Sequence, residues 1–249
     1  MTSEYANHLV AIPIKRTARR RNIGLVLLLL LGFLASIALT SFLLGHLPPY
    51  MLWHAALMLF VWGLVLPTGV LIARFFKVTP EQDFPKVRDN QFWWNWHRGL
   101  QYSGLILATF ATWLMWQKTG LAGSLHAQIG LTLLGFGWLQ AVSSWVRGSK
   151  GGPTEPQLSG AHYDMTLQRL IFEYWHKIFG WSCLLAALIA IGTGFYLVGT
   201  QQAVHFGVPI ALGSIFISIF AVLAKQKRWV DTYTAIWGHA FLSKQKRSP

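Results

Sequence analysis

The sequence has little sulfur chemistry and little charge. It contains one cysteine, Cys183, among 249 residues, so a disulfide within the chain is excluded. That cysteine lies in an apolar run, where we expect it to pack. Charged residues make up only 12% of the chain and hydrophobic residues 53%. Together with a mean hydropathy of +0.42, this composition argues against a water-soluble domain and indicates a protein that resides in lipid.

Negative charge is also scarce, and the formal net charge is +13. An excess of this size raises nucleic acid as a partner. However, the basic residues lie between long apolar runs rather than along one polar face. We therefore expect membrane lipid, and no nucleic acid, as the partner of these charges.

Six apolar stretches are long enough to cross a hydrocarbon core of ~30 Å. For the first, residues 23–44, a cleaved signal peptide is the alternative. The stretch is longer than a signal core, its basic flank lies far from the N-terminus, and no small-residue cleavage site follows. The fold class expected is an all-α polytopic membrane protein with six transmembrane helices. The other five are predicted at about residues 52–75, 93–116, 125–146, 172–198 and 204–224.

The distribution of Lys and Arg predicts the orientation, because cytoplasmic loops retain positive charge. Twenty of the 21 basic residues fall on one face, and only Lys118 falls on the other. Both termini should then be cytoplasmic. We divide the chain into a basic N-terminal segment (1–22), a six-helix domain (23–224, with its functional core at about 50–200) and a basic amphipathic tail (225–249). The tail is expected to form a helix on the membrane surface.

Four of the nine histidines are unusual, because each lies near the start of a predicted span, where an imidazole needs a partner. These are His54, His97, His126 and His176. The other five are expected in cytoplasmic segments or outer loops, where water or lipid headgroups satisfy them: His8, His162 and His239 inside, His46 and His205 outside.

Alternating helix direction sorts the four by depth, since the second and fourth helices start outside and the third and fifth start inside. His54 then pairs with His126, and His97 with His176. Two imidazoles facing each other across a four-helix core are typical of axial ligands to a haem. The chain has no CxxCH motif, so the haems would be b-type. The two irons would stand roughly 20 Å apart along the membrane normal.

Two glycines extend this pattern. Gly130 and Gly180 follow His126 and His176 by four residues and leave a side-chain-free patch on the same helix face, against which a porphyrin can lie. Close helix packing is an equally good explanation for either glycine alone. Zinc or non-haem iron is less favoured, because no cluster of Cys, Asp or Glu accompanies the pairs.

With these residues placed, the chain resembles the cytochrome b561 family of six-helix di-haem transmembrane reductases. The resemblance covers the second to fifth helices. The stretch from Gly160 to Thr166 looks like bacterial members, which implies an inner membrane. The motifs are Trp53-His-Ala-Ala-Leu-Met58, Leu66-Pro-Thr-Gly-Val-Leu-Ile-Ala-Arg74, Asn95-Trp-His-Arg-Gly-Leu-Gln101, His126-Ala-Gln-Ile-Gly130 and Trp175-His-Lys-Ile-Phe-Gly180.

The resemblance implies the same two ligand pairs. Family members that oxidise ascorbate use basic residues near the cytoplasmic haem, and Arg74, Lys77 and Arg98 are the candidates here. Anchoring of the chain or pairing with a haem propionate is the alternative role for each. No dopamine-hydroxylase-like sensor domain is expected in these 249 residues, so a quinol or a partner redox protein is a donor beside ascorbate.

Three functions follow from the sequence. The first is a transmembrane oxidoreductase that carries electrons from a cytoplasmic-side or membrane donor to an external acceptor. The second is a haem-containing relay or anchor subunit of a larger membrane redox complex, with a homodimer as the alternative assembly. The third is a haem-free transporter or scaffold with structural histidines.

Overall fold

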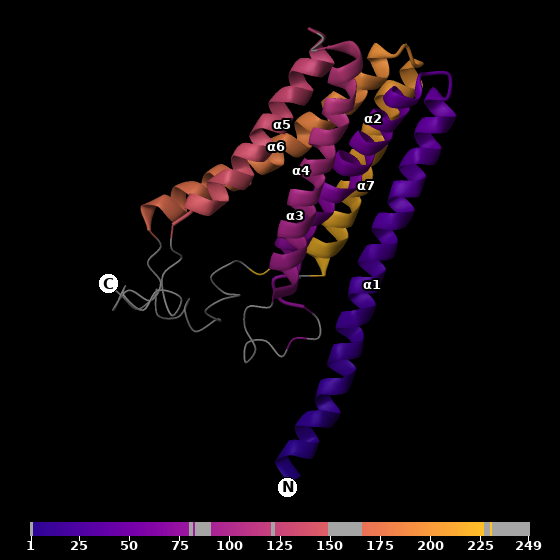
Figure 1. The fold of residues 1–249 in the computed structure, drawn as a ribbon. Helices are drawn as coiled ribbons and strands as arrows, with labels where there is room; N and C mark the ends of the chain where they lie inside the picture. Colours follow the sequence, from indigo (N-terminus) through magenta and orange to yellow (C-terminus); the bar gives the residue numbers. More distant parts are fainter. Residues whose placement is uncertain are drawn as a thin grey trace.

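The computed structural model describes residues 2–79, 82, 91–120, 123–148, 166–226 and 230, with side chains from residue 17 onward. Long helices stand side by side in a bundle (Figure 1). Over these described ranges the chain contains no β-strand. The all-α fold class predicted from the sequence is therefore confirmed. The predicted surface helix in the tail lies almost entirely outside the described residues.

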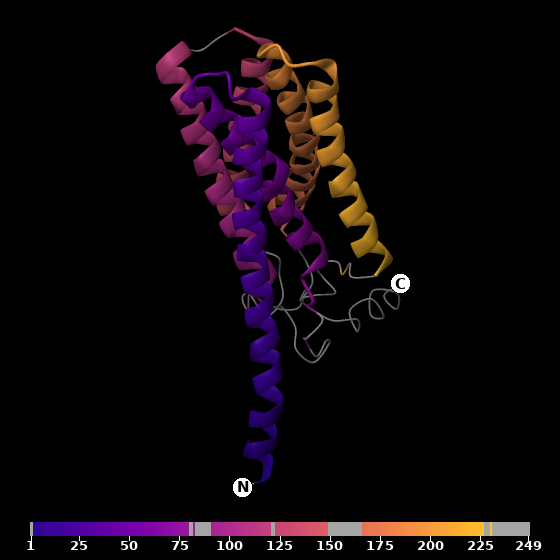
Figure 2. The ribbon, with the colours of Figure 1, turned by 90° about the vertical axis from the view of Figure 1, so that its right-hand side faces the viewer.

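Helix α1 (Thr2–Leu44) is 43 residues long and extends beyond the bundle at its N-terminal end (Figure 2). The predicted span at residues 23–44 is its C-terminal half. The basic segment before it is helical as well and continues the same helix. Lys and Arg are good helix formers, which accounts for this continuation.

The second crossing is built from three pieces: α2 (Pro49–Phe60), a π-helical stretch (Val61–Val65) and α3 (Leu66–Phe75). Pro49 suits the first turn of a helix, where its missing N–H is not needed. Pro67 removes an N–H farther along the crossing, and the wider π-helical turns lie directly before it.

The remaining helices are α4 (Gln91–Thr119), α5 (Leu125–Ser143), α6 (Leu167–Leu197) and α7 (Gln202–Lys225), with a short 3₁₀ turn (Ser144–Val146) after α5. The Ser124 side chain accepts from the N–H of Ala127, and Thr166 accepts from that of Arg169. These N-caps fix where α5 and α6 begin.

Within the described residues, five segments are long and apolar enough to cross a membrane: Thr17–Leu44, Pro49–Phe75, Leu125–Val146, Leu167–Leu197 and Gln202–Lys225. Outward-facing Leu31, Phe42 and Ile217 are each at least 65% exposed, as expected for surfaces that contact lipid. Helix α4 is not among the five, because Asn95, His97 and other polar residues lower its hydropathy. It is 29 residues long and packs against α2, α3 and α5.

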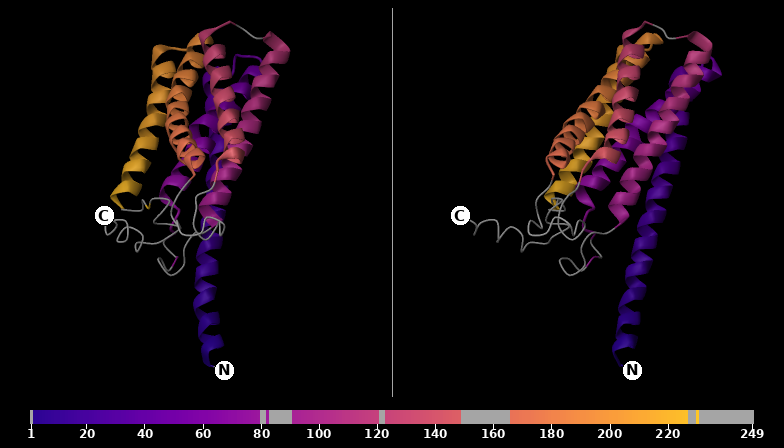
Figure 3. Two further views of the ribbon diagram at one scale, coloured as in Figure 1. Left: turned by 90° about the vertical axis from the view of Figure 1, so that its left-hand side faces the viewer. Right: turned by 60° about the vertical axis from the view of Figure 1, so that its left-hand side comes forward.

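The helices alternate in direction. The start of α1 and the end of α7 lie at one end of the bundle, and the α1–α2, α4–α5 and α6–α7 connections lie at the other (Figures 1 and 3). The start of α1 and the end of α7 thus lie on the same side, as six crossings predict.

Candidate functional site: two histidine pairs

The first pair joins α2 to α5. The ring centroids of His54 and His126 lie 6.1 Å apart, with their planes at 84°. The Nδ1 of His54 lies 3.0 Å from the Ala111 carbonyl on α4, and the Nδ1 of His126 lies 3.0 Å from the Ala190 carbonyl on α6. A carbonyl only accepts, so each Nδ1 carries the proton and donates. Each Nε2 is left with a lone pair, as a metal ligand requires.

The second pair joins α4 to α6 at the opposite end of the bundle. His97 and His176 have the same centroid separation, 6.1 Å, and an interplanar angle of 83°. The Nδ1 of His97 donates to the Gly69 carbonyl on α3 over 3.0 Å. The ring of Phe172 stacks on His176 with centroids 5.1 Å apart. Helix alternation thus predicts the same neighbours that the structure brings together.

The depth difference between the pairs can be worked out along two helices. Ala111, which holds His54, is fourteen residues beyond His97 on α4, and Ala190, which holds His126, is fourteen beyond His176 on α6. At ~1.5 Å rise per residue, both helices give a separation of about 21 Å. An apolar cluster of Val61, Trp62, Leu66, Ala108, Leu133, Ala187 and Ala190 fills the bundle between these levels.

Two glycines position the histidine rings, and sequence reasoning missed both. A Cβ on Gly194 would lie 2.9 Å from Cε1 of His126. A Cβ on Gly69 would lie 2.6 Å from the amide nitrogen of Gln101, which donates to the Leu66 carbonyl, so glycine leaves room for that amide beside the carbonyl to which His97 donates. The sequence offers a clue, since both glycines lie inside predicted helices (52–75 and 172–198), where glycine costs about 1 kcal/mol relative to alanine.

The two glycines predicted from the sequence, Gly130 and Gly180, lie beside the histidine pairs but differ in what surrounds them. A Cβ on Gly130 would have no atom of the chain within 4 Å. Open space therefore faces α5 one turn beyond His126. A Cβ on Gly180 would make ordinary contact with the Gln140 side chain, 3.7 Å away.

The geometry of the pairs fits axial ligation of a haem. Two imidazoles that bind one metal through Nε2, each with a bond of ~2.0 Å and a ring centre ~1.1 Å behind the nitrogen, have centroids roughly 6.2 Å apart. Both observed separations are 6.1 Å. No group of three or more His, Cys, Asp or Glu suited to a metal occurs among the described residues. A porphyrin would supply the other four donor atoms.

Comparison with known proteins finds related sequences that are named for a cytochrome b561 domain. The chain is 29% identical over 176 residues to a cytochrome b561, DM13 and DOMON domain-containing protein of Arabidopsis thaliana, a match that covers 68% of this chain and 17% of the relative. Two cytochrome b561 and DOMON domain-containing proteins of the same plant are 25% and 23% identical, over 72% and 73% of this chain and 35% and 42% of theirs. These similarities support a relationship between this chain and the cytochrome b561 family.

The chain spans less than half the length of each of these relatives, 17–42% of it. No protein-family model matches the sequence. No solved structure gives a significant match.

Basic residues gather at the His97/His176 end. Arg74 lies in the last turn of α3, and Lys77, just after it, lies 5.9 Å above the Trp93 ring. Arg98 is exposed on α4 and lies 5.6 Å from the centre of the Trp94 ring.

Sequence reasoning counted two further cations, Arg147 and Arg169, only as topology signals. Arg147 lies 4.6 Å above the ring of Trp94, the same ring that Arg98 approaches. Burial lowers the pKa of Arg147, and the nearby Arg169 and Arg98 lower it further. Arg169 is buried and donates to Glu173 over 3.2 Å. It precedes His176 by seven residues, which places both on one face of α6.

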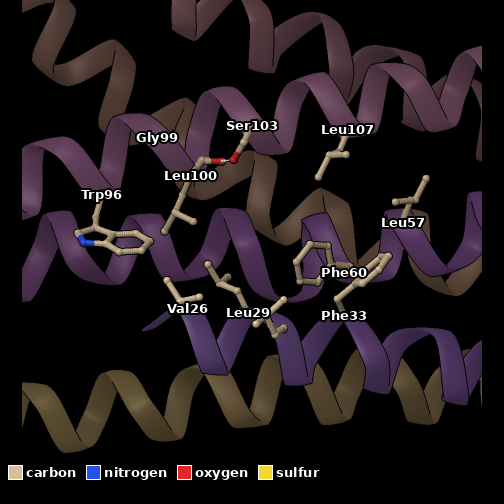
Figure 4. Close-up of a pocket in the computed structure, with 11 residues that line it drawn as sticks. Val26, Leu29, Phe33, Leu57, Phe60, Trp96, Gly99, Leu100, Ser103 and Leu107 are labelled. Carbon is tan, nitrogen blue, oxygen red and sulfur yellow. Dashed lines mark hydrogen bonds between the residues drawn. The ribbon is translucent and has the colours of Figure 1, made fainter. Parts of the chain in front are cut away.

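An apolar groove of about 540 Å³ lies between α1, α2 and α4 (Figure 4). Trp96 and Leu100 of α4, neighbours of His97 in the sequence, line it together with Val26, Phe33 and Phe60. None of the four paired histidines lines this groove, so it is separate from both pairs.

One histidine was misplaced by sequence reasoning. His205 was expected in an outer loop, but it lies in the first turn of α7 and is 8% exposed. The loop between α6 and α7 is short, so the ring packs against Tyr196 and its Nδ1 lies 3.3 Å from the Thr200 carbonyl. This contact with the Thr200 carbonyl satisfies the His205 Nδ1, so the ring needs no cofactor as a partner. Cys183 packs against the apolar cluster, as expected.

Proposed function

We propose that this chain is a di-haem b-type cytochrome that transfers electrons across the membrane. The observation that carries the proposal is a pair of neighbouring imidazoles at each of two levels, with ring centroids 6.1 Å apart in both pairs and three of the four rings held at Nδ1 by a backbone carbonyl. His54 with His126, and His97 with His176, would be the axial ligands of the two haems. When bound, the haem irons supply the one-electron redox change.

The protein's own contribution is to hold the haems, to orient the histidine rings and to keep water away from them. The hydrogen bonds to the Ala111, Gly69 and Ala190 carbonyls fix ring orientation and leave Nε2 unprotonated. The apolar cluster between the two levels keeps water out of the bundle centre. No side chain needs to act as an acid, a base or a nucleophile.

The positive-inside pattern supports an orientation with both termini cytoplasmic. His97 and His176 then lie on the cytoplasmic side, and His54 and His126 on the external side, facing an external acceptor. A bacterial inner membrane stays a prediction, since the three relatives are plant proteins.

Two classes of donor fit the cytoplasmic end. The mutual repulsion of Arg98, Arg147 and Arg169 favours a bound anion, either an ascorbate-like donor or a haem propionate. The apolar groove beside Trp96 suits a lipid-soluble quinol. We expect one of these two classes to reduce the protein from this side.

The test is electron transfer across a sealed vesicle. Purified protein is reconstituted with ferricyanide trapped inside, and ascorbate or a short-chain quinol is added outside. Trapped ferricyanide should be reduced with the wild type and not with His54→Ala or His97→Ala. Equal rates with wild-type protein and with empty vesicles would refute transmembrane transfer.

A relay or anchor subunit of a larger complex is the second candidate. The part of α1 that extends beyond the bundle is the segment that would reach such a neighbouring subunit (Figure 2). In that case the isolated chain holds haem but transfers no electrons between small molecules in the vesicle assay.

A further inference from the structure

The four histidines differ in what holds their Nδ1 atoms. His54, His97 and His126 face backbone carbonyls. His176 instead faces the side chain of Gln140, which comes from α5 and is 8% exposed. The second histidine pair therefore has one ligand candidate whose partner can rotate.

The Gln140 amide makes a complete set of contacts in one orientation. Its oxygen accepts from the Gly180 N–H over 2.7 Å, while its nitrogen lies 2.8 Å from Nδ1 of His176 and 3.2 Å from the His176 carbonyl. In this orientation the amide nitrogen donates to Nδ1. The imidazole then carries its proton on Nε2, the nitrogen that faces His97 in a ligand pair.

Ligation requires the opposite tautomer. A neutral imidazole that binds metal through Nε2 carries its proton on Nδ1, and two donors would then face each other across 2.8 Å. Rotating the amide by about 180° puts its oxygen at the same position. The two ends of an amide are nearly equal in size, so this needs no extra space. The rotated oxygen then faces the His176 carbonyl, and the rotated nitrogen faces the Gly180 N–H.

We propose that Gln140 is a positioning residue whose amide accepts the Nδ1 proton of His176 when that histidine binds haem, and that its rotation is coupled to ligation. This inference rests on the proposed function. A backbone carbonyl only accepts, so the other three ligands have no such switch. Substitutions of Gln140 should therefore change the midpoint potential of the haem held by His176. They should leave the potential of the His54/His126 haem unchanged.

The sharpest variant is Gln140→Glu, which keeps the shape. An ionised carboxylate accepts at both oxygens, from Nδ1 of His176 and from the Gly180 N–H, and so increases the basicity of the ligand. Stronger basicity stabilises ferric over ferrous haem. A tenfold change in that preference corresponds to a drop of about 59 mV in midpoint potential. Gln140→Leu removes the acceptor, and the potential should rise instead.

The experiment is a redox titration of the full chain in detergent, with wild type and both variants also prepared in a His54→Ala background that retains only the second haem. Gln128 of α5 provides the matched control, because its amide is exposed and bonds the Gly123 carbonyl. We expect opposite shifts for Gln140→Glu and Gln140→Leu and none for Gln128→Glu or Gln128→Leu.

Unchanged midpoints in both Gln140 variants, or equal shifts in the Gln128 variants, would overturn the inference. If Gln140→Leu does not fold, the shape-conserving Gln140→Glu decides alone. Absence of haem bands in the wild type would instead refute the proposed function, so the two failures are distinguishable.

Discussion

Replacing Gly194 with alanine should remove the His54/His126 haem while leaving the other. The new Cβ would lie 2.9 Å from Cε1 and 3.1 Å from Nδ1 of His126, and ordinary contact begins at 3.4 Å. The ring would have to move by at least about 0.5 Å, more than twice the ~0.2 Å tolerance of a metal–ligand bond. It cannot simply retreat, because its Nδ1 is bonded to the Ala190 carbonyl one turn earlier on the same helix.

Perturbing a group that orients a metal ligand typically lowers affinity about 10- to 100-fold, which corresponds to roughly 1.4–2.8 kcal/mol. The alanine itself favours helix by up to about 1 kcal/mol, so unfolding would not explain the loss. Haem per chain and the reduced-minus-oxidised spectrum measure the effect. Gly135→Ala on α5, where a Cβ meets nothing within 4 Å, is the control. A Gly194→Ala protein with two haems of wild-type affinity would refute the argument.

Four further outcomes are expected. Gly69→Ala should push the Gln101 amide off the Leu66 carbonyl, next to the carbonyl that holds His97, and selectively weaken the other haem, as measured by haem per chain; loss of the His54/His126 haem instead would contradict the assignment. Gly130→Ala should weaken haem binding although no atom of the chain lies within 4 Å of the new methyl, and unchanged affinity would show that no porphyrin lies there. Glu173→Gln removes the negative charge beside buried Arg169 while its oxygen can still accept from Nε, and it should lower the free energy of unfolding by about 2 kcal/mol. Lys177→Gln, whose side chain is 63% exposed, should cost under ~0.5 kcal/mol in the same detergent melt. Removing haem should lower the melting temperature, because a ligand bound only to the folded state stabilises it; an unchanged melt would argue against structural haem sites.

The histidine neighbours could be predicted because their positions depend on two strong signals, apolar length and helix direction. His54 and His126 both follow, by a few positions, a connection at the same end of the bundle, so they share a depth whatever the details of packing. The same reasoning gives the separation of the two levels, since helical rise is nearly constant.

The contacts that orient the rings could not be predicted in this way. Ala111 and Ala190 contribute only backbone carbonyls, which leave no signature in a sequence. The role of Gln140 depends on the rotation of α5 about its own axis, and the burial of His205 depends on how the short loop turns into α7. These features are set by tertiary packing rather than by hydrophobic pattern.

The central claim is tested most directly by counting haem in the wild type and in four single variants, His54→Ala, His126→Ala, His97→Ala and His176→Ala, with a reduced-minus-oxidised spectrum of each. We predict two haems per wild-type chain. The first two variants should lose one and the same haem, and the last two should lose the other. One haem in the wild type, or variants of a single pair that lose different haems, would contradict it.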